Sequence, residues 1–285
     1  MRLEVDTFKT TSHAAAHEGL HQLAFELNQA NVSFILSTAQ LPHGAKRTQG
    51  SVVSSQIIAA LGTLSSILEI TQELSLRVKE AIALSRVFYE TCLIAAFISS
   101  DEGESAEKAE LYSVYKAFRT QTQFREVLGV KFGIKRQPAI RRDDPRVRDA
   151  LEVFGGSSNV RPCFVENREE MVQCIGQHDR TAALLFGGVE AMVHDFASEV
   201  IHGSYYGAQM FDFLANGPQD KARNIESHFE AVYFSVCLSI AALARSVTRL
   251  QSAEAPMASV ASSAVELLLP HVPEDLREQL CGLSL

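Results

Sequence analysis

Proline is the residue that most constrains this chain, because only eight occur in 285 residues and long stretches lack it. A proline inside a helix removes a backbone hydrogen bond and clashes with the preceding turn, so proline-free stretches allow long helices. Within these stretches apolar residues recur at three- and four-residue spacing, which is the pattern of an amphipathic helix. The sequence therefore predicts an all-α fold, a single helical bundle of about eight to ten helices.

The helical pattern divides the chain into two halves around a middle segment of different composition. In the first half helices are predicted over about 11–36, 52–74 and 76–98, and from the break at 99–104 through about 128. In the second half they are predicted over about 166–177, 181–214, 220–250, 257–269 and 274–280. Glycines at 187–188 and 203 predict kinks in the 181–214 helix, and the segment 41–50 is predicted to be a loop.

The middle segment is strongly basic and is interrupted by prolines. Residues 131–148 hold seven Lys or Arg against two Asp, together with two prolines that prevent a long helix. We therefore predict one helical domain with a basic insertion. Its parts are a first helical half over 10–128, an irregular basic insertion over 129–165 and a second helical half over 166–285.

Clustered cations in this insertion are candidates for binding a phosphate backbone, which needs local positive charge more than a basic whole protein. The residues predicted to do so are Lys135, Arg136, Arg141 and Arg142. A solvated loop that pairs with nearby acidic residues is the alternative. Phe132 is the only aromatic residue between 131 and 148, so this segment by itself predicts little stacking on bases.

Charge and cysteine content restrict the compartment and the partners. The formal net charge of −8 argues against broad binding to nucleic acid or to an anionic membrane. Five cysteines without a Cys-x-x-Cys pair predict free thiols in a cytoplasmic protein. The N-terminus lacks a secretory pattern, and the longest uncharged apolar run, Ala231–Ala244, is too short to span a bilayer, so we expect no membrane association. The chain lacks the sequence motifs of nucleotide-binding and nucleophile sites, so we expect no cofactor. The apolar helices of the second half predict a homodimer.

One apolar helix of the second half carries an unusual set of ionisable residues. Asp195, Glu199 and His202 are spaced i, i+4, i+7 and would share one face of a helix. Arg86 and Glu90 form an i, i+4 pair on an earlier apolar helix. If the two helices pack together, these five residues form a buried polar network. The network is interpreted either as structural, fixing helix register, or as an acid/base pocket in which His202 titrates near neutrality.

Three short segments combine polar and aromatic residues along the chain. They read RVFYE at 86–90, AELYSVYKAF at 109–118 and SEVIHGSYY at 198–206. In this order they resemble an uncharacterised bacterial all-α family whose members carry an Arg-x-x-x-Glu helix and a later His-Gly-Ser or His-Pro-Ser helix. The resemblance covers about 52–214. Because that family has no settled activity, the resemblance implies a helical fold and a role for these polar positions, but no reaction.

A further motif lies at the start of the helix predicted over 220–250. Arg223 and His228 are separated by four residues, and Asn224 follows the arginine directly. This arrangement is similar to the R-x4-6-H motif of HEPN domains, helical bundles that include ribonucleases of toxin and phage-defence systems. The resemblance implies that Arg223 and His228 act on RNA with help from Asn224, without a metal, at a dimer interface. The alternative is a helix start with an exposed arginine and a half-buried histidine.

These features lead to three hypotheses for the function. The first is an RNA-directed protein of bacterial defence or toxin type, a ribonuclease in which imidazole moves the proton of the ribose 2′-hydroxyl and guanidinium stabilises phosphate charge. The second is a non-enzymatic interaction or regulatory module with a structural polar network. The third is a di-metal carboxylate bundle. Its ligands would be two Glu-x-x-His pairs, Glu18 with His21 and Glu199 with His202, and the other carboxylates could come from Glu69 or Glu90.

Overall fold

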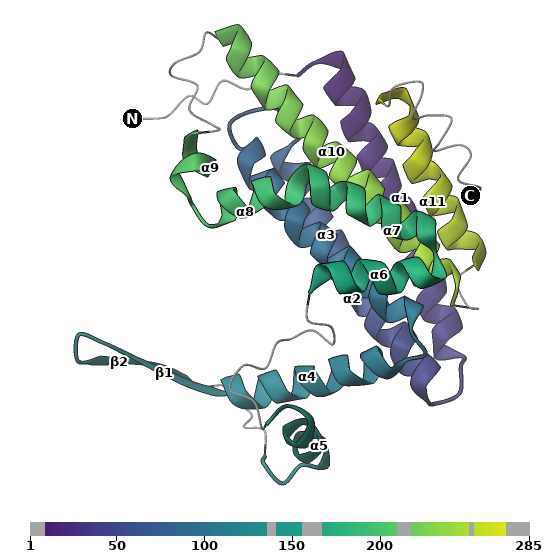
Figure 1. Cartoon of the computed structure of the whole chain (residues 1–285), viewed down its shortest axis with the longest axis vertical. Helices are drawn as coiled ribbons and strands as arrows, with labels where there is room; N and C mark the ends of the chain where they lie inside the picture. Colours follow the sequence, from purple (N-terminus) through teal and green to yellow (C-terminus); the bar gives the residue numbers. More distant parts are fainter. Residues whose placement is uncertain (1–8, 136–140, 156–166, 210–217, 251–253, 272–285) are drawn as a thin grey trace.

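The computed structural model describes residues 9–135, 141–155, 167–209, 218–250 and 254–271. Over these residues the predicted all-α fold is confirmed, with one two-stranded antiparallel sheet in addition. The long helices pack side by side in one bundle, and a helix and a hairpin extend from one end of it (Figure 1). The extension comes from the middle of the sequence.

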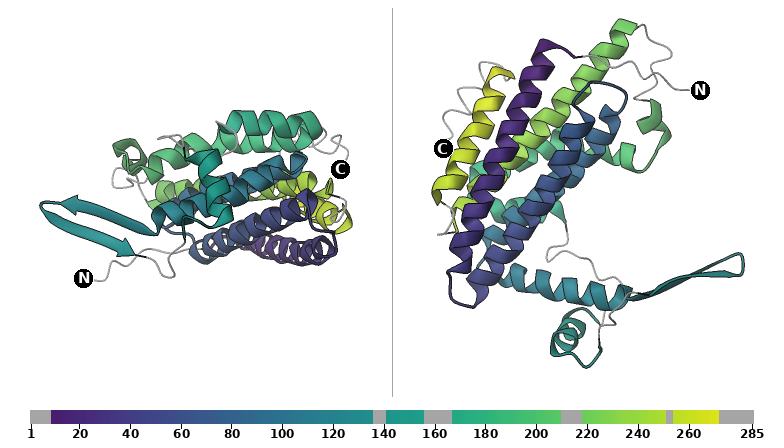
Figure 2. Two further views of the ribbon diagram at one scale, coloured as in Figure 1. Left: turned by 90° about the horizontal axis from the view of Figure 1, so that it is seen from below. Right: turned by 180° about the vertical axis from the view of Figure 1, so that it is seen from behind.

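Two long apolar helices, α3 (Val78–Ser100) and α10 (Pro218–Thr248), pack against each other at the centre of the bundle. On one side they are covered by α1 (Thr11–Ala39), α2 (Ala45–Ile70) and α11 (Glu254–Leu268), which is followed by a short 3-10 turn. The right-hand view of Figure 2 shows this side of the bundle, with α11, α1 and α2 next to one another.

A second layer of short helices covers the opposite side of α3 and α10. It consists of α6 (Arg168–His178), α7 (Arg180–Val189), the π-helix η1 (Glu190–His194), α8 (Asp195–Ile201) and α9 (Tyr205–Gln209). The helix predicted over 181–214 is therefore divided, and its first break lies at the π-helix rather than at 187–188. Gly203, at φ +61°, lies where the chain turns after α8, as expected.

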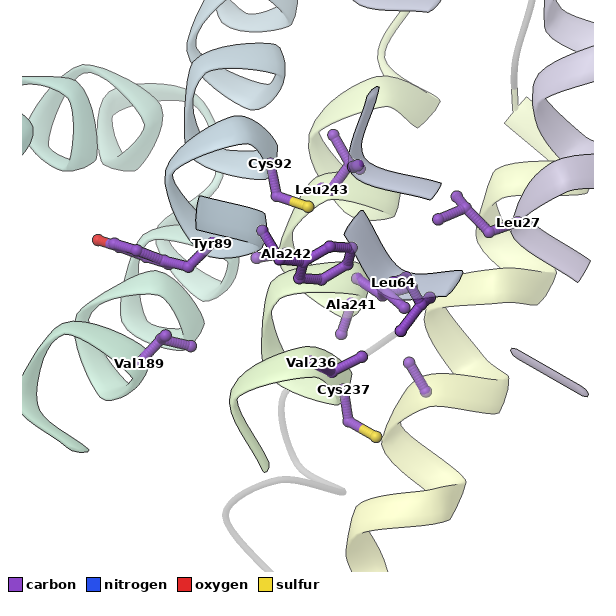
Figure 3. Packing of buried hydrophobic residues seen from close by; sticks show 14 of the residues in the cluster. Leu27, Leu64, Tyr89, Cys92, Val189, Val236, Cys237, Ala241, Ala242 and Leu243 are labelled. Carbon is purple, nitrogen blue, oxygen red and sulfur yellow. The ribbon is translucent and has the colours of Figure 1, made fainter. Parts of the chain in front are cut away.

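Small side chains let the two central helices approach each other closely. The fully buried alanines of these two helices are Ala81, Ala95 and Ala96 on α3 and Ala241, Ala242 and Ala244 on α10. Figure 3 shows Tyr89 of α3 beside this packing, turned toward the helix that carries Val189, with its hydroxyl at the edge of the apolar core. The apolar packing therefore brings one polar edge of α3 against the second layer of helices.

The basic middle of the sequence forms an arm at the end of the bundle. Helix α4 (Glu104–Thr120) leads into strands β1 (Thr122–Val127) and β2 (Val130–Lys135), and α5 (Pro145–Phe154) packs beside α4. Both views in Figure 2 show the two strands projecting away from the helices. We refer to residues 122–135 as the hairpin arm.

The helix predicted through about 128 is shorter than expected, because α4 ends at Thr120 and the chain continues as β1. The sequence pattern that is typical of a strand lies in the next segment, β2, rather than in β1. β2 reads VKFGIK, in which apolar residues alternate with polar residues or glycine. Pairing with β2 turns residues 122–127 into a strand, so the basic insertion contains regular elements within its described part.

The loop predicted at 41–50 is also shorter than expected, because α2 is helical from Ala45. Gln49 is buried there and donates from Nε2 to the carbonyl oxygens of Ile98 and Asp101, at 2.7 and 2.8 Å. A polar side chain of the predicted loop thus ties the start of α2 to the end of α3. The helix predicted over 274–280 lies outside the described residues.

Three helices are long and apolar enough to cross a membrane by length and composition alone: α2, α3 and residues 220–248 of α10. Of their most apolar windows, 61% is buried in α3 and 72% in α10, against 39% in α2. The apolar window of α10 is therefore mostly covered within the bundle, whereas Leu184, Met192 and Ile201 of the second layer are exposed. The least covered of the three helices is α2, in the first half.

Candidate functional site

A group of charged and aromatic side chains joins α3 to the second layer of helices. We refer to it as the π-helix cluster, and its members are Arg86, Tyr89, Glu90, Arg168, Glu190 and His194. The first three come from α3, the fourth from α6 and the last two from η1. Such single π-turns within helical segments are rare and occur frequently at functional sites.

Glu190 accepts hydrogen bonds from two other elements. Tyr89 donates its hydroxyl to Glu190 Oε2 at 2.7 Å, and Arg168 donates from Nε to Glu190 Oε1 at 3.1 Å. Burial and this hydrogen bond raise the pKa of Tyr89 well above its usual value, so the hydroxyl stays protonated and remains a donor. The carboxylate thereby ties η1 to both α3 and α6.

Glu90 makes a second set of contacts. Arg86 donates from Nε to Glu90 Oε1 at 3.0 Å, and Nη1 of Arg168 lies 3.8 Å from the same oxygen. The His194 ring lies between the two carboxylates, with Nε2 3.5 Å from Glu90 Oε1 and Nδ1 3.7 Å from Glu190 Oε1. The His194 side chain is 6% exposed, whereas both glutamate side chains are 37% exposed. The exposed Asp195 adds a third carboxylate, because its Oδ1 lies 3.5 Å from His194 Nδ1.

Two buried nitrogens of the cluster, Arg86 Nη1 and His194 Nε2, have no hydrogen-bond partner within the described part of the chain. A buried polar atom left without a partner costs about 1–3 kcal/mol. The cluster therefore acts as a charged cross-link between three elements rather than as a fully satisfied network.

The predicted network across the two helices does not form, although the ion pair predicted within α3 is present between two half-buried side chains. Arg86 and Glu90 form the expected pair. Asp195 and His202 are exposed and Glu199 is half-buried, so these three do not form a buried stripe against α3.

The reason lies in the orientation of the helix around the π-turn. Val193 and Ala197 are buried and occupy the inward face, which turns the acidic stripe of α8 outward. The π-turn also adds a residue to the helix, so an α-helical projection from 181 misplaces the side chains beyond the turn. The Glu-x-x-x-His spacing of Glu190 and His194 was a usable signal, whereas no local pattern marks Arg168 as their partner.

The predicted catalytic residues lie near the start of α10. Arg223 is exposed, and Asn224 and His228 are half-buried. Five residues turn the side-chain direction on an α-helix by about 140°, so Arg223 and His228 point to different sides. His228 Nδ1 lies 2.6 Å from the carbonyl oxygen of Asn224, so this nitrogen carries the proton, and the ring stacks on Phe196 with centroids 5.2 Å apart. Burial lowers the pKa of His228, and a neutral ring protonated on Nδ1 accepts a proton on Nε2.

The hairpin arm carries exposed aromatic and basic side chains. Arg125 pairs with Phe132 across the ladder, and directly paired residues lie on the same face. Phe132 is 60% exposed, and Phe124 is 69% exposed on the other face, opposite Gly133. No described helix packs extensively against either strand. Sequence reasoning missed Phe124 and Arg125 because they were assigned to a helix.

The tip of the arm is apolar and has an unusual backbone. Leu128 is 99% exposed with φ +52°, and Gly129 follows with φ +78°. Positive φ at both central residues is typical of a two-residue type I′ turn, in which a leucine is strained. Val127 and Val130, paired on either side of the turn, are also exposed.

Basic residues outnumber acidic ones along the arm. Residues 122–135 contain three Lys or Arg and one acidic residue, Glu126. Of the predicted phosphate-binding residues, Arg141 and Arg142 are exposed, Lys135 is the last residue of β2, and Arg136 is not among the described residues. Arg141 Nε lies 3.7 Å from Asp143 Oδ1, so part of its charge is balanced locally.

The di-metal hypothesis lacks a ligand cluster. Both Glu-x-x-His pairs are described, yet among the described residues no three His, Cys, Asp or Glu side chains gather as they would around a metal ion. Glu90, one of the proposed ligands, is instead held by Arg86 and Arg168. The described residues therefore provide no ligand set for this hypothesis.

Comparison of the chain with protein-family models, with curated proteins and with solved structures finds no match. The resemblances to the bacterial all-α family and to HEPN domains stay predictions. The geometry of the chain itself therefore carries the functional assignment.

Proposed function

We propose that the chain binds single-stranded RNA through the hairpin arm. The observation that carries the proposal is the exposed pair of Phe132 and Arg125 on one face of a ribbon that stands clear of the bundle (Figure 1). Aromatic rings on exposed strands stack on unpaired bases, and neighbouring cations neutralise the phosphates between those bases. A ring and a cation side by side are the minimal unit of such a surface.

The exposure of the apolar residues on the arm supports this proposal. A two-stranded hairpin is marginally stable alone, and apolar side chains that contact only water add nothing to its stability. Phe124 and Phe132 lie on opposite faces, so a flexible single strand can meet either ring, whereas a stiff duplex cannot stack on them. RNA is proposed rather than DNA because of the resemblance at Arg223 and His228.

RNA cleavage is a second candidate function, favoured by the state of His228. The hydrogen bond to the Asn224 carbonyl and the burial of the ring favour a neutral imidazole whose Nε2 is the basic atom. In that reaction Nε2 takes the 2′-hydroxyl proton and the 2′-oxygen attacks the adjacent phosphorus, forming a 2′,3′-cyclic phosphate. The bond from phosphorus to the 5′-oxygen breaks, and the 5′-oxygen takes a proton from solvent water. Arg223 points to another side of α10, so its guanidinium does not lie beside the His228 ring within one copy.

The binding proposal is tested by fluorescence anisotropy with a labelled oligouridine of about 15 nucleotides, which matches the site size of small single-strand binders. Phe132→Ala is expected to weaken binding by about 1–3 kcal/mol, the contribution of one stacked base. Arg125→Ala with Lys131→Ala is expected to lower the slope of log affinity against log salt by about 1.4, or about 0.7 for each lost phosphate contact.

Arg180→Ala is the matched control, because Arg180 is an exposed arginine on α7, outside the arm. Single-stranded DNA and duplex RNA of the same length measure the preference for RNA and for an unpaired strand. Binding that is absent in the wild type, or equal in the arm variants and the control, refutes the proposal. Cleavage is followed separately on the same RNA, where His228→Ala should abolish product without weakening binding.

A further inference from the structure

The outward face of α2 is an uncovered apolar surface of the bundle. Residues 48–68 contain no charged side chain, and Ile58 in their middle is 55% exposed. The neighbouring helix α1 adds exposed apolar residues on one face: Phe25, Val32 and Leu36, spaced i, i+7, i+11. A groove of about 430 Å³ lies between the two helices. Figure 2 shows α1 and α2 side by side on the outside of the bundle, with no helix in front of them.

The hydroxyl groups on α2 do little to make this surface polar. Ser55, Thr63 and Ser66 donate to the carbonyl oxygens four residues earlier, at 2.9, 3.2 and 3.3 Å. Their donors are turned onto their own helix, so they present mainly carbon to the outside. Three of the hydroxyl groups of α2 thus offer their donors to their own helix rather than to the outside.

A cation lies at one end of this face and an anion at the other. Arg47 and Glu69 each lie eleven residues from Ile58, and eleven residues are about three helical turns, so all three share one side of α2. A cation at the N-terminus and an anion at the C-terminus of a helix both oppose its dipole, so helix stability does not account for them. In the described part of the chain Glu69 has no ion pair, and the contact of Arg47 is a 3.5 Å hydrogen bond to the Leu41 carbonyl oxygen.

We propose that this face is the interface of a homodimer in which two copies of α2 cross antiparallel about a two-fold axis at Ile58. Residues equally far from Ile58 then face each other, so Arg47 meets the partner's Glu69 and the reverse pair forms at the other end. Ser51 and Ser65 lie seven residues on either side of Ile58 and meet in the same way, which keeps the crossing close. Phe25 flanks the groove and meets the partner at its edge.

A second copy accounts for this face better than a lipid surface does. Anionic lipid attracts clustered Lys and Arg, whereas this face has one cation and one anion at opposite ends. An antiparallel copy covers the apolar centre and pairs both charges with one symmetry operation. The interface lies on α1 and α2, away from the hairpin arm and from His228, so it does not depend on the RNA proposal.

Sedimentation velocity of the full chain over a range of concentrations tests the interface. The wild type is expected to dimerise, and Ile58→Asp, which brings two carboxylates together at the axis, is expected to raise the dimer dissociation constant at least about tenfold. Leu184→Asp is the matched control, because Leu184 is also 55% exposed but lies on α7 in the opposite layer. Unchanged circular dichroism shows that both variants remain folded.

A charge exchange tests the antiparallel arrangement itself. Arg47→Glu and Glu69→Arg should each weaken the dimer, and the double variant should restore it, because the two charges then pair again with their signs reversed. A wild type that stays monomeric, a dimer that survives Ile58→Asp, or a double variant weaker than both single variants overturns the proposal. So does binding of the monomer to phosphatidylserine vesicles that Ile58→Asp abolishes, since the face would then belong to a membrane.

Discussion

Two phenylalanines summarise the contrast between the bundle and the hairpin arm. Phe88 on α3 is fully buried between packed helices, whereas Phe132 on β2 is 60% exposed on a ribbon that no described helix covers extensively. Polar groups differ in the same way, since Tyr89, Arg168 and Glu190 of the π-helix cluster bind one another across three elements while the described charged side chains of the arm are exposed. The contrast indicates that the bundle holds the stability of the chain and that the arm is available for a ligand.

The largest expected effect is the loss of a ring from the core. Phe88→Ala should lower the free energy of unfolding by about 3–5 kcal/mol, because it removes buried surface and leaves a cavity. Phe132→Ala removes the same atoms from the arm and should change it by less than about 0.5 kcal/mol. Urea denaturation followed by circular dichroism measures both. Equal losses in the two variants would show that the arm is packed as tightly as the core.

The next effect is the loss of a shared carboxylate. Glu190→Ala leaves the Tyr89 hydroxyl and Arg168 without their acceptor and should cost about 1–3 kcal/mol. Glu126→Ala in the arm, across the ladder from Lys131, should cost at most about 0.5 kcal/mol because both side chains are exposed. The same denaturation experiment compares them. If Glu190→Ala leaves the free energy of unfolding unchanged, the π-helix cluster adds no net stability.

Acid should weaken the bundle while leaving the arm unaffected. Burial lowers the pKa of His13 and His17, which contact the carbonyl oxygens of Thr71 and Leu68 through Nε2 at 2.8 and 2.9 Å. The unfolded chain, with histidine pKa 6.5, then binds protons more readily than the folded chain. Stability is therefore complete above pH 6.5 and is lost as the pH falls from there through the lowered pKa values, by at most about 1.4 kcal/mol per pH unit for each histidine.

His13→Gln tests this pH dependence, because glutamine keeps an N–H donor for the Thr71 carbonyl but does not titrate. Its unfolding free energy should fall less steeply below pH 6.5 than that of the wild type. Residues 122–135 contain no histidine, so RNA binding by the folded protein should change little between pH 7.5 and pH 6. If the unfolding free energy of the variant falls with pH as steeply as that of the wild type, groups other than His13 cause the acid sensitivity.

The smallest expected effect concerns the turn of the arm. Leu128→Asn places a residue that tolerates positive φ at a strained position and should stabilise the hairpin locally by at most about 1 kcal/mol. Hydrogen exchange of the β1 and β2 amides should slow, while the unfolding midpoint of the bundle stays unchanged. Val127→Asn, outside the two positions of positive φ, is the control and should not slow exchange.

Local patterns in the chain were sufficient for the helices and for contacts within one helix. Apolar periodicity depends only on the geometry of a helix, so the observed bounds of α1 and α3 lie within a few residues of those predicted. The Arg86–Glu90 pair was predictable for the same reason, since residues four apart meet on any helix. The basic character of the middle segment also follows from composition alone.

Contacts between distant residues depended on how the helices pack. Tyr89 and Glu190 are 101 residues apart, and Arg168 reaches both carboxylates from a third element. Periodicity indicates which face of a helix is buried, but not which neighbour covers it or where a π-turn rotates it. Asp195 and His202 therefore face solvent, although their spacing predicted burial. Phe124 belongs to the arm because β2 pairs with residues 122–127. The partners of these side chains were determined by the packing of whole elements, which no single segment encodes.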